Sequence, residues 1–560
     1  MTTILRVWHD TPVKHFINER STIVTEALDA TVMLGEGKLA RLDGFPSIKV
    51  VVRTDWTRAE VAIVAGGGSG HEPAHAGYVG DGMLTAAVCG EIFASPSVEA
   101  VLAGILAVTG EAGCLLVVKN YTGDRLNFGL AAEKARALGL AVEMVVVADD
   151  IAIADAPRPR GLAGTLFVHK VAGHLARAGA SLEVVRAGAE RVAGAVRSLG
   201  LSLSSCTIPG QPQGDRMGPL EVELGLGIHG EPGAEKIPLA SMREFAAAMS
   251  LRLDAALGAA RLPVALLVND LGGVPAIEMA VATHSLLGAL KREIVLVLGP
   301  GRLMTSLDMK GLSVSVLPVD EALLIALRSK VGPEAWPSAR SLTKVVPLPL
   351  PSRMQALAPA ASAHAPRRLV IETVCTTLIG LEAALNALDA KVGDGDTGST
   401  FATAARAILM ALDELPFDAP AALCAGLADR LGTVMGGSSG ILLSIGVAAM
   451  GAAVSTPPDW PAALREGVRR IELYGGAQPG DRTMLDALHP AVAALEAKEG
   501  LRAAAVSARR GADRTSMMTR ARAGRSSYVP EDALRGVPDP GAFAIAAIFE
   551  ALAAGSAEGL

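Results

Sequence analysis

Glycine and histidine are concentrated in one stretch of the chain, GGGSGHEPAHAGYV, over residues 66–79. The glycines allow the backbone to approach a ligand closely or to adopt a positive φ, while His71, Glu72 and His75 supply hydrogen-bond donors and acceptors. An apolar, strand-like run over 61–65 comes immediately before this stretch. The combination predicts a binding site for a small molecule.

The segment from His71 to His75 also satisfies the H-E-x-x-H string of zinc peptidases. That chemistry needs both histidines one turn apart in a helix, where Pro73 would remove a hydrogen bond and clash unless it lay in the first turn. A dinucleotide loop beginning at Gly66 would need glycine where His71 stands. Both interpretations are therefore disfavoured, and we expect His71 to bind no metal.

Three carboxylates lie close together in LDAKVGDGDTGSTF, namely those of Asp389, Asp394 and Asp396. Carboxylates this close repel one another unless a cation neutralises them, and Mg²⁺ binds carboxylates together with waters and phosphates. An EF-hand is excluded because the D-x-D-x-D-G order and the distal glutamate are missing. A solvated acidic turn at a helix end would also account for such a cluster.

Further polar loops follow in the same part of the chain. Residues 435–440, MGGSSG, precede an apolar helix and offer backbone N–H groups to a phosphate. The segments GDRTMLDAL and AGRSSYV add Arg482 and Arg525. Because no G-x-x-x-x-G-K-[ST] occurs, a nucleotide here would not be held by a Walker loop.

The hydrophobic pattern predicts the elements that position these residues. Short apolar runs alternate with helix-like segments in the first half, which indicates an α/β fold. Polar clusters follow three of these runs and converge if the strands are parallel, because ligands bind beyond the carboxyl ends of such strands. A second α/β block begins at Leu182, and His229 is expected at the end of one of its strands. The runs of the first block predicted as strands are 49–52, 61–65, 114–118 and 141–148.

A linker and a helical domain follow. Between 341 and 367, proline and alanine recur without helical spacing, which is typical of a linker. After it, apolar residues recur at three- and four-residue spacing without a convincing strand. We therefore predict two α/β subdomains over 1–181 and 182–340, the linker over 341–367, and an all-helical domain over 368–560.

Composition narrows the class of partner. The 560 residues carry a net charge of −6 without long runs of either sign, which argues against a nucleic-acid surface. Five scattered cysteines suit free thiols in a reducing cytoplasm, and the first residues lack the apolar segment of a secretion signal. The uncharged segment 431–458 approaches a membrane-spanning length, but its glycines, serines and prolines favour a fully buried helix. We expect a cytoplasmic protein that binds small molecules and has no membrane or nucleic-acid partner.

A series of motifs runs along nearly the whole chain in this order: GGGSGHEPAHAGYV, VKNYTGD, LGLGIHGEPG, VNDLGG, TSLDM, VGDGDTGSTF, GGSSG, PGDRTMLDAL, GRSSYV and DPGA. In these motifs and their order, the chain resembles the single-polypeptide, ATP-dependent dihydroxyacetone (glycerone) kinases. In that family a ketose-binding K domain precedes a helical nucleotide-binding L domain.

The resemblance implies a ketose pocket in the K domain. His229 would bond covalently to the carbonyl carbon of the substrate as a hemiaminal, which a neutral imidazole is nucleophilic enough to form. His71 and Asp124 would assist this addition and accept the proton of the reacting hydroxyl. The remaining implied substrate contacts are Gly68, Ser69, Gly70 and Lys119.

For the L domain, the resemblance implies an eight-helix antiparallel barrel that binds ATP. Asp389, Asp394 and Asp396 would hold Mg²⁺ against the phosphates, and the K domains would form a homodimer. The implied nucleotide contacts are Thr397, Gly398, Ser399, Thr400, Ser438, Ser439, Arg482 and Arg525.

Several functions fit these motifs. The first expectation is ATP-dependent phosphorylation of dihydroxyacetone. A four-carbon ketose such as erythrulose presents the same hydroxyketone end, and relatives also split FAD into a cyclic flavin phosphate at the L-domain metal site. A ketose-loaded regulatory module would need no metal site, so the three aspartates argue against it. A phosphotransferase-system subunit with bound ADP is disfavoured because no phosphocarrier-like domain is appended.

Overall fold

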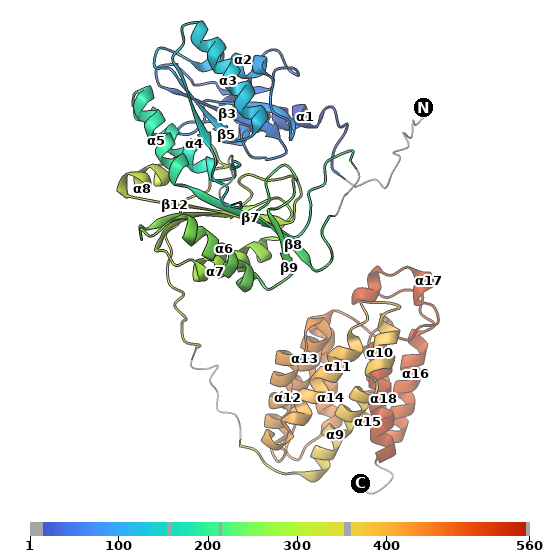
Figure 1. Cartoon of the computed structure of the whole chain (residues 1–560). Coiled ribbons are helices and arrows are strands. Elements are labelled where there is room, and N and C mark those ends of the chain that lie inside the picture. Colours follow the sequence, from blue (N-terminus) through green and yellow to red (C-terminus); the bar gives the residue numbers. More distant parts are fainter. Residues whose placement is uncertain (1–14, 154–158, 212–215, 352–359, 556–560) are drawn as a thin grey trace, which may run out of the picture. The chain divides into compact units, whose positions relative to one another are not determined.

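The computed structural model of the protein describes residues 15–153, 159–211, 216–351 and 360–555. The chain forms two compact units, residues 1–346 and 347–560. The first unit contains two β-sheets with helices, and the described part of the second contains helices and no strand (Figure 1). The predicted fold class, α/β followed by all-helical, is confirmed.

The first sheet has the strand order β1-β2-β4-β3-β5-β6. Its four strands from β4 to β6 are parallel, whereas β1 and β2 pair in the antiparallel sense. The four runs predicted as strands correspond to β2, β3, β5 and β6. The bounds are β1 (Leu39–Arg41), β2 (Val50–Arg53), β3 (Ala62–Ser69), β4 (Ala86–Ile92), β5 (Cys114–Lys119) and β6 (Val142–Val147).

Two features of this sheet differ from the expectation. β3 continues through GGGS to Ser69 instead of ending at Ala65, and β4 was not among the strands predicted from the sequence. Gly66 explains the close pairing of these two strands, because a Cβ there would lie 2.1 Å from the carbonyl oxygen of Val88 in β4. The glycines therefore serve sheet packing as well as ligand access.

The first unit is layered, and side chains alternate between the layers. Ile63 of β3 faces the core shared by the two sheets, whereas Val64 faces the opposite core. Helices α2 (Val98–Val108) and α3 (Thr122–Ala137) cover that opposite face, and α4 (Thr165–Arg177), α5 (Leu182–Ala195) and α8 (Glu321–Arg328) lie between the sheets (Figure 1). This alternation is the period-2 pattern of a sheet buried on both sides.

The second sheet has the order β11-β10-β12-β7-β8-β9. Only its β10–β11 pair is parallel. Helices α6 (Met242–Ala256) and α7 (Ala276–Ala289) cover its outer face. The bounds are β7 (Arg197–Ser202), β8 (Glu221–Leu224), β9 (Glu235–Pro238), β10 (Val264–Asp270), β11 (Ile294–Gly301) and β12 (Gly311–Pro318).

His229 lies in a loop and not at a strand end, which corrects the prediction. β8 already ends at Leu224, because Gly225 adopts φ +73°, a left-handed conformation that turns the chain. The loop that follows closes where Ala234 N–H donates to the carbonyl of Gly225 at 3.0 Å. His229 is therefore carried on a loop over 225–234.

Eight of the described helices of the second unit form a closed ring. Each packs against the next in the order α9, α11, α12, α13, α14, α15, α16, α18, and α18 packs against α9. The ring is the eight-helix barrel that the resemblance implies, and it encloses an apolar cavity of about 190 Å³. The shorter α10 (Glu382–Asp389) and α17 (Glu531–Leu534) lie between ring helices in sequence. The ring helices are α9 (Ala365–Gly380), α11 (Thr397–Met410), α12 (Pro420–Val434), α13 (Gly437–Ala453), α14 (Trp460–Gly475), α15 (Leu485–Glu496), α16 (Leu501–Thr515) and α18 (Pro540–Gly555).

Four connections of this ring fall at the same end. Short connections between neighbouring helices make them antiparallel, so every second connection returns to one end. The segments at this end are 390–396, 435–436, 476–484 and 516–539. Two of them are bonded directly, since Arg522 N–H donates to the carbonyl of Asp481 at 3.1 Å. The loops predicted to bind a nucleotide therefore share one end of the barrel.

The uncharged segment 431–458 forms part of this ring. Its helix α13 is not fully buried, contrary to our expectation, because one face packs on α12 and α14 while Ile441 on another face is exposed. The expectation of full burial rested on the absence of charged residues from this segment. Over the described ranges, the structure has no single helix long and apolar enough to cross a membrane, and the bent pair α9 and α10 passes such a test by length and composition only.

Candidate functional site

The glycine-rich segment is bonded to the connection between β11 and β12. Leu307 N–H donates to the carbonyl of Gly70 at 2.9 Å, and the hydroxyl of Thr305 donates to the carbonyl of Glu72 at 2.9 Å. The Tyr78 hydroxyl donates to the carbonyl of Leu303 in the same connection. The candidate site is therefore assembled from two parts of the chain that lie far apart in sequence.

His71 is fully buried and held in one tautomer. Its Nδ1 lies 2.8 Å from the carbonyl oxygen of Thr305, which can only accept, so Nδ1 carries the ring proton. Its Nε2 has no hydrogen-bond partner among the described residues. Burial, with the nearby His229 and Lys119, lowers the pKa of His71 well below its usual value. The ring is neutral and offers one free lone pair.

His75 contacts a different group. Its Nε2 lies 2.6 Å from Nζ of Lys119, which donates to it. Burial lowers the pKa of Lys119 although the Asp124 carboxylate raises it. Pro73 and the short 3₁₀ turn η1 (Ala76–Tyr78) take the place of the helix that zinc peptidases require. The two histidines of the H-E-x-x-H string therefore make hydrogen bonds to separate partners.

Lys119 and Asp124 meet beside Gly67. Each residue is 1% exposed, and a Cβ on Gly67 would lie 2.8 Å from Nζ of Lys119 and 3.4 Å from Oδ2 of Asp124. The Ser95 hydroxyl donates to Oδ1 of Asp124. Lys119 ends β5 and Asp124 lies in the first turn of α3, so both charged groups lie at the carboxyl end of a parallel strand.

The other predicted substrate contacts are Gly68, Ser69 and Gly70, at and after the end of β3. A Cβ on Gly68 would lie 2.7 Å from the backbone nitrogen of Ala94, so only glycine fits there. The Ser69 hydroxyl donates to the carbonyl of Gly90 at 2.8 Å, which ties β3 to β4. Gly70 has φ +98°, a conformation that favours glycine.

Three rings surround the imidazole of His229. The ring centroids of His71, Phe93 and Tyr121 lie 4.8, 5.4 and 4.3 Å from it, and each ring is nearly perpendicular to it. The side chain of His229 is 18% exposed. The imidazole is therefore confined and still accessible to a small ligand.

Phe93 and Tyr121 were not predicted from the sequence. Tyr121 stands in KNYTGD, directly before α3, and its position next to two predicted site residues was the available signal. Phe93 follows β4, an element that we had not predicted, and its φ of +57° is rare for a bulky residue. The position of Phe93 depends on the β3–β4 pairing, which the sequence pattern did not reveal.

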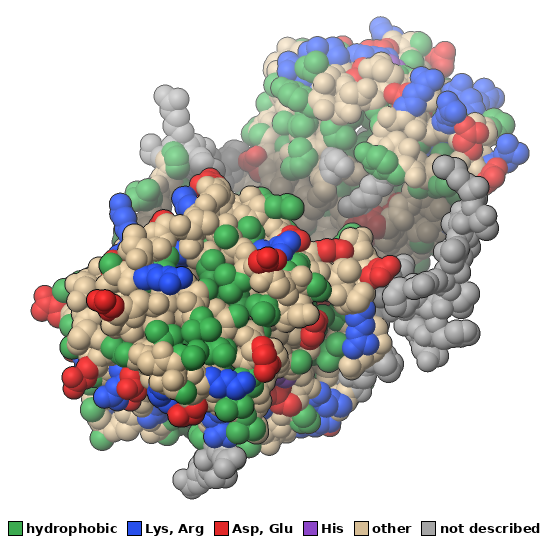
Figure 2. Space-filling view, turned by 90° about the horizontal axis from the view of Figure 1, so that it is seen from above, with side chains coloured by type: hydrophobic (Ala, Val, Ile, Leu, Met, Phe, Trp, Pro, Cys, Tyr) green, Lys and Arg blue, Asp and Glu red, His purple; other side chains and the backbone are tan. Residues whose placement is uncertain are grey.

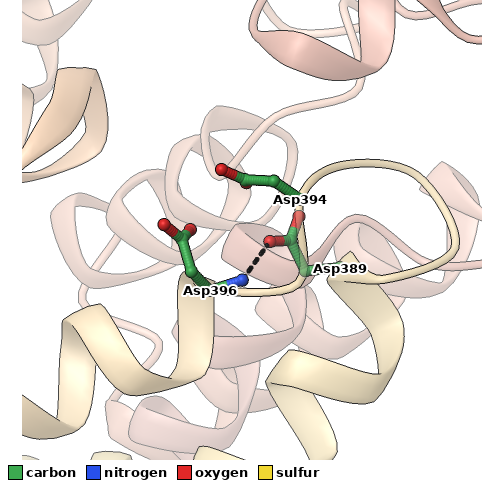
Figure 3. A group of neighbouring side chains, drawn as sticks. All are labelled: Asp389, Asp394 and Asp396. Carbon is green, nitrogen blue, oxygen red and sulfur yellow. Dashed lines mark hydrogen bonds between the residues drawn. The ribbon is translucent and has the colours of Figure 1, made fainter. Parts of the chain in front are cut away.

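The three aspartates of the second unit come together where α10 ends and α11 begins (Figure 3). One oxygen from each carboxylate lies within 4.8 Å of the others. Asp389 is buried, and its Oδ2 accepts the N–H groups of Gly395, Asp396 and Thr397 at 3.0, 3.0 and 3.2 Å. Asp389 thus fixes the turn that presents the other two carboxylates, both of which are exposed.

This arrangement fits a magnesium ion. Mg²⁺ takes one or two carboxylates, several waters and substrate phosphates. Exposed Asp394 and Asp396 leave room for such ligands, and the turn depends on Gly395, which adopts φ +81°. Gly393 also matters, because a Cβ there would lie 2.3 Å from Oδ1 of Asp389.

Some of the predicted nucleotide contacts near this turn are already engaged in contacts within the protein. Ser399 is already engaged, since its N–H donates to Oδ1 of Asn386 at 3.0 Å and its hydroxyl accepts from the same amide at 2.9 Å. Gly398 is buried against α10, where a Cβ would lie 2.1 Å from the carbonyl oxygen of Glu382. Thr397 and Thr400 lie in the first turn of α11. The groups that this helix end offers to a ligand are therefore mainly backbone N–H groups.

The remaining four predicted contacts lie elsewhere at the same end of the ring. Ser439 lies in the first turn of α13, whose N-cap Gly436 offers no side chain to that turn. The guanidinium of Arg482 is buried and donates to the carbonyl of Val537 at 2.8 Å, while its Nε and Nη1 have no partner among the described residues. Ser438 and Arg525 are placed only by their backbone, and their side chains lie outside the described part.

Comparison with known proteins gives the family of both units. Residues 37–335 match the Dak1 domain and residues 391–554 match the DAK2 domain. The chain is 48% identical over 551 residues to the dihydroxyacetone kinase of Citrobacter freundii, covering 96% of this chain and 98% of that protein. It is 42% identical over 537 residues to the triokinase/FMN cyclase of Homo sapiens, covering 90% and 93%.

A solved structure agrees with these matches. The crystal structure of the dihydroxyacetone kinase from C. freundii in complex with AMP-PNP and Mg²⁺ matches with a TM-score of 0.77 at 46% sequence identity. The match covers 97% of this chain and 99% of that chain.

Proposed function

The chain belongs to the single-chain dihydroxyacetone kinase family, and we propose that it transfers a phosphoryl group from ATP to dihydroxyacetone. The observation that carries this proposal is the confined His229 imidazole beside the free Nε2 of His71. The separate aspartate turn supports it, because it can hold the metal of a nucleotide complex. Within this proposal, segments 1–181 and 182–340 bind the ketone, segment 341–367 is a linker, and segment 368–560 binds ATP.

His229 binds the substrate through its carbonyl. An unprotonated imidazole nitrogen adds to the ketone and gives a hemiaminal, which fixes the substrate with a primary hydroxyl free to react. Glycerol has no carbonyl and cannot form this bond. A hydrophobic pocket alone discriminates by only about 1–3 kcal/mol per small group, so the covalent step supplies the selectivity.

His71 and Asp124 are the two candidates for the base that accepts the hydroxyl proton. Nε2 of His71 is unprotonated and has no partner among the described residues, but burial lowers the pKa of this ring, whereas the Asp124 carboxyl group accepts the Ser95 hydroxyl at Oδ1. Lys119 and Asp124 then bind the hydroxyl groups of the substrate, and Gly68, Ser69 and Gly70 shape the wall. A base of this kind contributes about 10²- to 10⁴-fold to the rate.

Asp389, Asp394 and Asp396 would hold Mg²⁺, which offsets the charge of the ATP phosphates when it is bound. The first turns of α11 and α13 would direct N–H groups at the same phosphates. Arg482 and Arg525 come from the loops at the same end of the barrel. The proposed nucleotide contacts are Thr397, Gly398, Ser399, Thr400, Ser438, Ser439, Arg482 and Arg525.

One experiment tests the covalent role. ATP-dependent phosphorylation of dihydroxyacetone should disappear in His229→Ala, and so should the mass shift of the intact protein on incubation with the ketone. Turnover retained by His229→Ala would refute the covalent role.

A second experiment tests the separation of the two sites. Asp394→Asn combined with Asp396→Asn should abolish nucleotide use and leave the mass shift intact. Loss of both would contradict two independent sites.

The substrate range needs its own measurement. Dihydroxyacetone, both erythrulose enantiomers, glyceraldehyde and FAD should be compared in one coupled assay. A flavin-splitting activity at the aspartate turn is the second candidate, favoured by the 42% identity to a triokinase/FMN cyclase. It would survive His229→Ala and disappear in the double aspartate variant, which separates it from the kinase reaction.

We also propose a homodimer formed through the first unit. Hydrophobic side chains gather on the face of this unit shown in Figure 2. Exposed leucines on α2, on α3 and directly after α3 are Leu106, Leu126, Leu130 and Leu138, at 41, 66, 51 and 64%. Exposed apolar patches mark interaction surfaces. Light scattering should report a dimer that Leu126→Glu with Leu130→Glu dissociates.

A further inference from the structure

We infer that Glu231 is a positioning residue that orients His229 for its addition to the ketone and stabilises the resulting adduct. The inference rests on the proposed covalent role of His229. It adds a carboxylate, two residues along the chain, that the sequence motifs alone do not single out.

Glu231 folds back beneath the loop that carries His229. Its Oε2 accepts the backbone N–H of His229 at 2.7 Å, and its Oε1 lies 3.8 Å from Nδ1 of the same residue. Gly227 makes this path possible, because a Cβ there would lie 2.1 Å from Oε1 of Glu231. The carboxylate therefore faces both the backbone and the imidazole of one residue.

Two arginines hold this loop in place. Arg216 donates to the carbonyls of Gly230 and Glu231 at 2.7 and 3.0 Å, and it is itself paired with buried Glu223. Arg160 donates to the carbonyl of Gly225 at 2.7 Å, and its Nη1 lies 3.9 Å from Oε1 of Glu231. The positions of Glu231 and His229 are thus fixed from both sides of the loop.

The Glu231 carboxyl group is ionised next to the imidazole of His229. Burial alone would raise the pKa of the Glu231 carboxyl, but the imidazole and the backbone N–H groups outweigh it and keep the pKa below its usual value. An ionised carboxylate beside Nδ1 favours the tautomer with the proton on Nδ1, which leaves the lone pair on Nε2. The opposite edge of the ring is then the nucleophile.

Formation of the adduct strengthens the interaction between the His229 ring and the Glu231 carboxylate. Nε2 forms a bond to the carbonyl carbon, the π pair of the carbonyl moves onto its oxygen, and that oxygen takes a proton from solvent. Nδ1 keeps its proton, so the ring becomes a cation beside the Glu231 carboxylate. The distance of 3.8 Å between Nδ1 of His229 and Oε1 of Glu231 is longer than a hydrogen bond, and we expect it to shorten once the ring is charged.

Glu231→Gln separates the charge from the loop contact. The amide oxygen of glutamine can still accept the N–H of His229, but the side chain is neutral. We expect the association constant of the ketone adduct, measured by mass shift without ATP, to fall about 10- to 100-fold. The matched control is Glu221→Gln on β8, whose exposed carboxylate pairs with Lys236 and should leave the adduct unchanged.

Three results decide the question. Glu231→Asp, which restores the charge, should regain part of the adduct, and thermal unfolding should show that all variants fold. Adduct formation by Glu231→Gln within about twofold of the unaltered protein would overturn the inference alone. No adduct on the unaltered protein, with activity retained in His229→Ala, would overturn the covalent function and this inference together.

Discussion

Gly67 offers the sharpest test of the pocket geometry. It stands in β3 with φ +148°, and a Cβ there would lie 2.8 Å from Nζ of Lys119. Ordinary van der Waals contact begins at 3.4 Å, so Gly67→Ala must push the ammonium away by about 0.6 Å. Lys119 is fully buried and bonded to His75, so this shift breaks an existing contact.

The magnitude follows from that displacement. A misplacement of about 1 Å in a reacting geometry costs on the order of 100-fold in rate, so we expect kcat/KM for dihydroxyacetone to fall about 30- to 100-fold. This corresponds to about 2–2.7 kcal/mol of transition-state stabilisation. The unfavourable φ should also destabilise the first unit by about 1–3 kcal/mol.

Steady-state kinetics with varied ketone and fixed ATP measure the first effect, and thermal unfolding measures the second. The matched control is Gly129→Ala in α3, where a Cβ would meet nothing within 4 Å. That change should stabilise the protein by about 0.5–1 kcal/mol and leave both substrates' kinetics unaltered.

Retained ketone kinetics in a folded Gly67→Ala would refute the reasoning. It would mean that Lys119 does not hold the substrate from the position described. A large rise in the KM for ATP would also contradict the reasoning, because Gly67 is not part of the aspartate turn that is proposed to bind the nucleotide.

Three further predictions concern other parts of the chain. Gly227→Ala should expel the Glu231 carboxylate and reduce the mass shift with ketone about as much as Glu231→Ala does, and an unchanged adduct would contradict the described loop. Burial raises the pKa of Asp539 from 3.8 to about 6, so the folded state holds a proton that the unfolded chain loses, and stability falls as pH rises between these values. Asp539→Asn should therefore gain up to about 3 kcal/mol near pH 8 and almost nothing near pH 4 in denaturant unfolding, and an equal effect at both would refute the assigned burial. Ser241→Ala removes the capping box of α6 and should cost about 1 kcal/mol in thermal unfolding with unchanged kinetics, whereas altered ketone kinetics would show that α6 reaches the site.

Much of the fold could be predicted because its signals are local. The apolar runs at β2, β3, β5 and β6 stand out from their surroundings, and the helical spacing after residue 368 marks the ring. β4 was missed because its residues follow glycines that look like a loop. The pairing of Gly66 in β3 with Val88 in β4 shows that these glycines lie in a strand, and this pairing cannot be recognised from the local sequence.

The site was less accessible from sequence because its contacts are distant. His71 obtains its tautomer from Thr305, 234 residues along the chain. The position of His229 depends on Gly225 ending β8 early, and a pattern of alternating residues did not show that turn. The aspartates were easier, since their turn is built from residues 389–397 alone.

Closure of the helical ring has a consequence for synthesis on the ribosome. The contact between α9 and α18 joins the first and last described helices of the second unit. Until α18 has been translated, the ring of the other seven helices stays open and the apolar side chains that face its interior remain exposed to solvent. Exposed apolar surfaces promote aggregation. The strands of the first unit are complete by Pro318, so that unit can fold while the ring is still being made. Nascent chains paused before α18 should therefore bind chaperones through the ring alone.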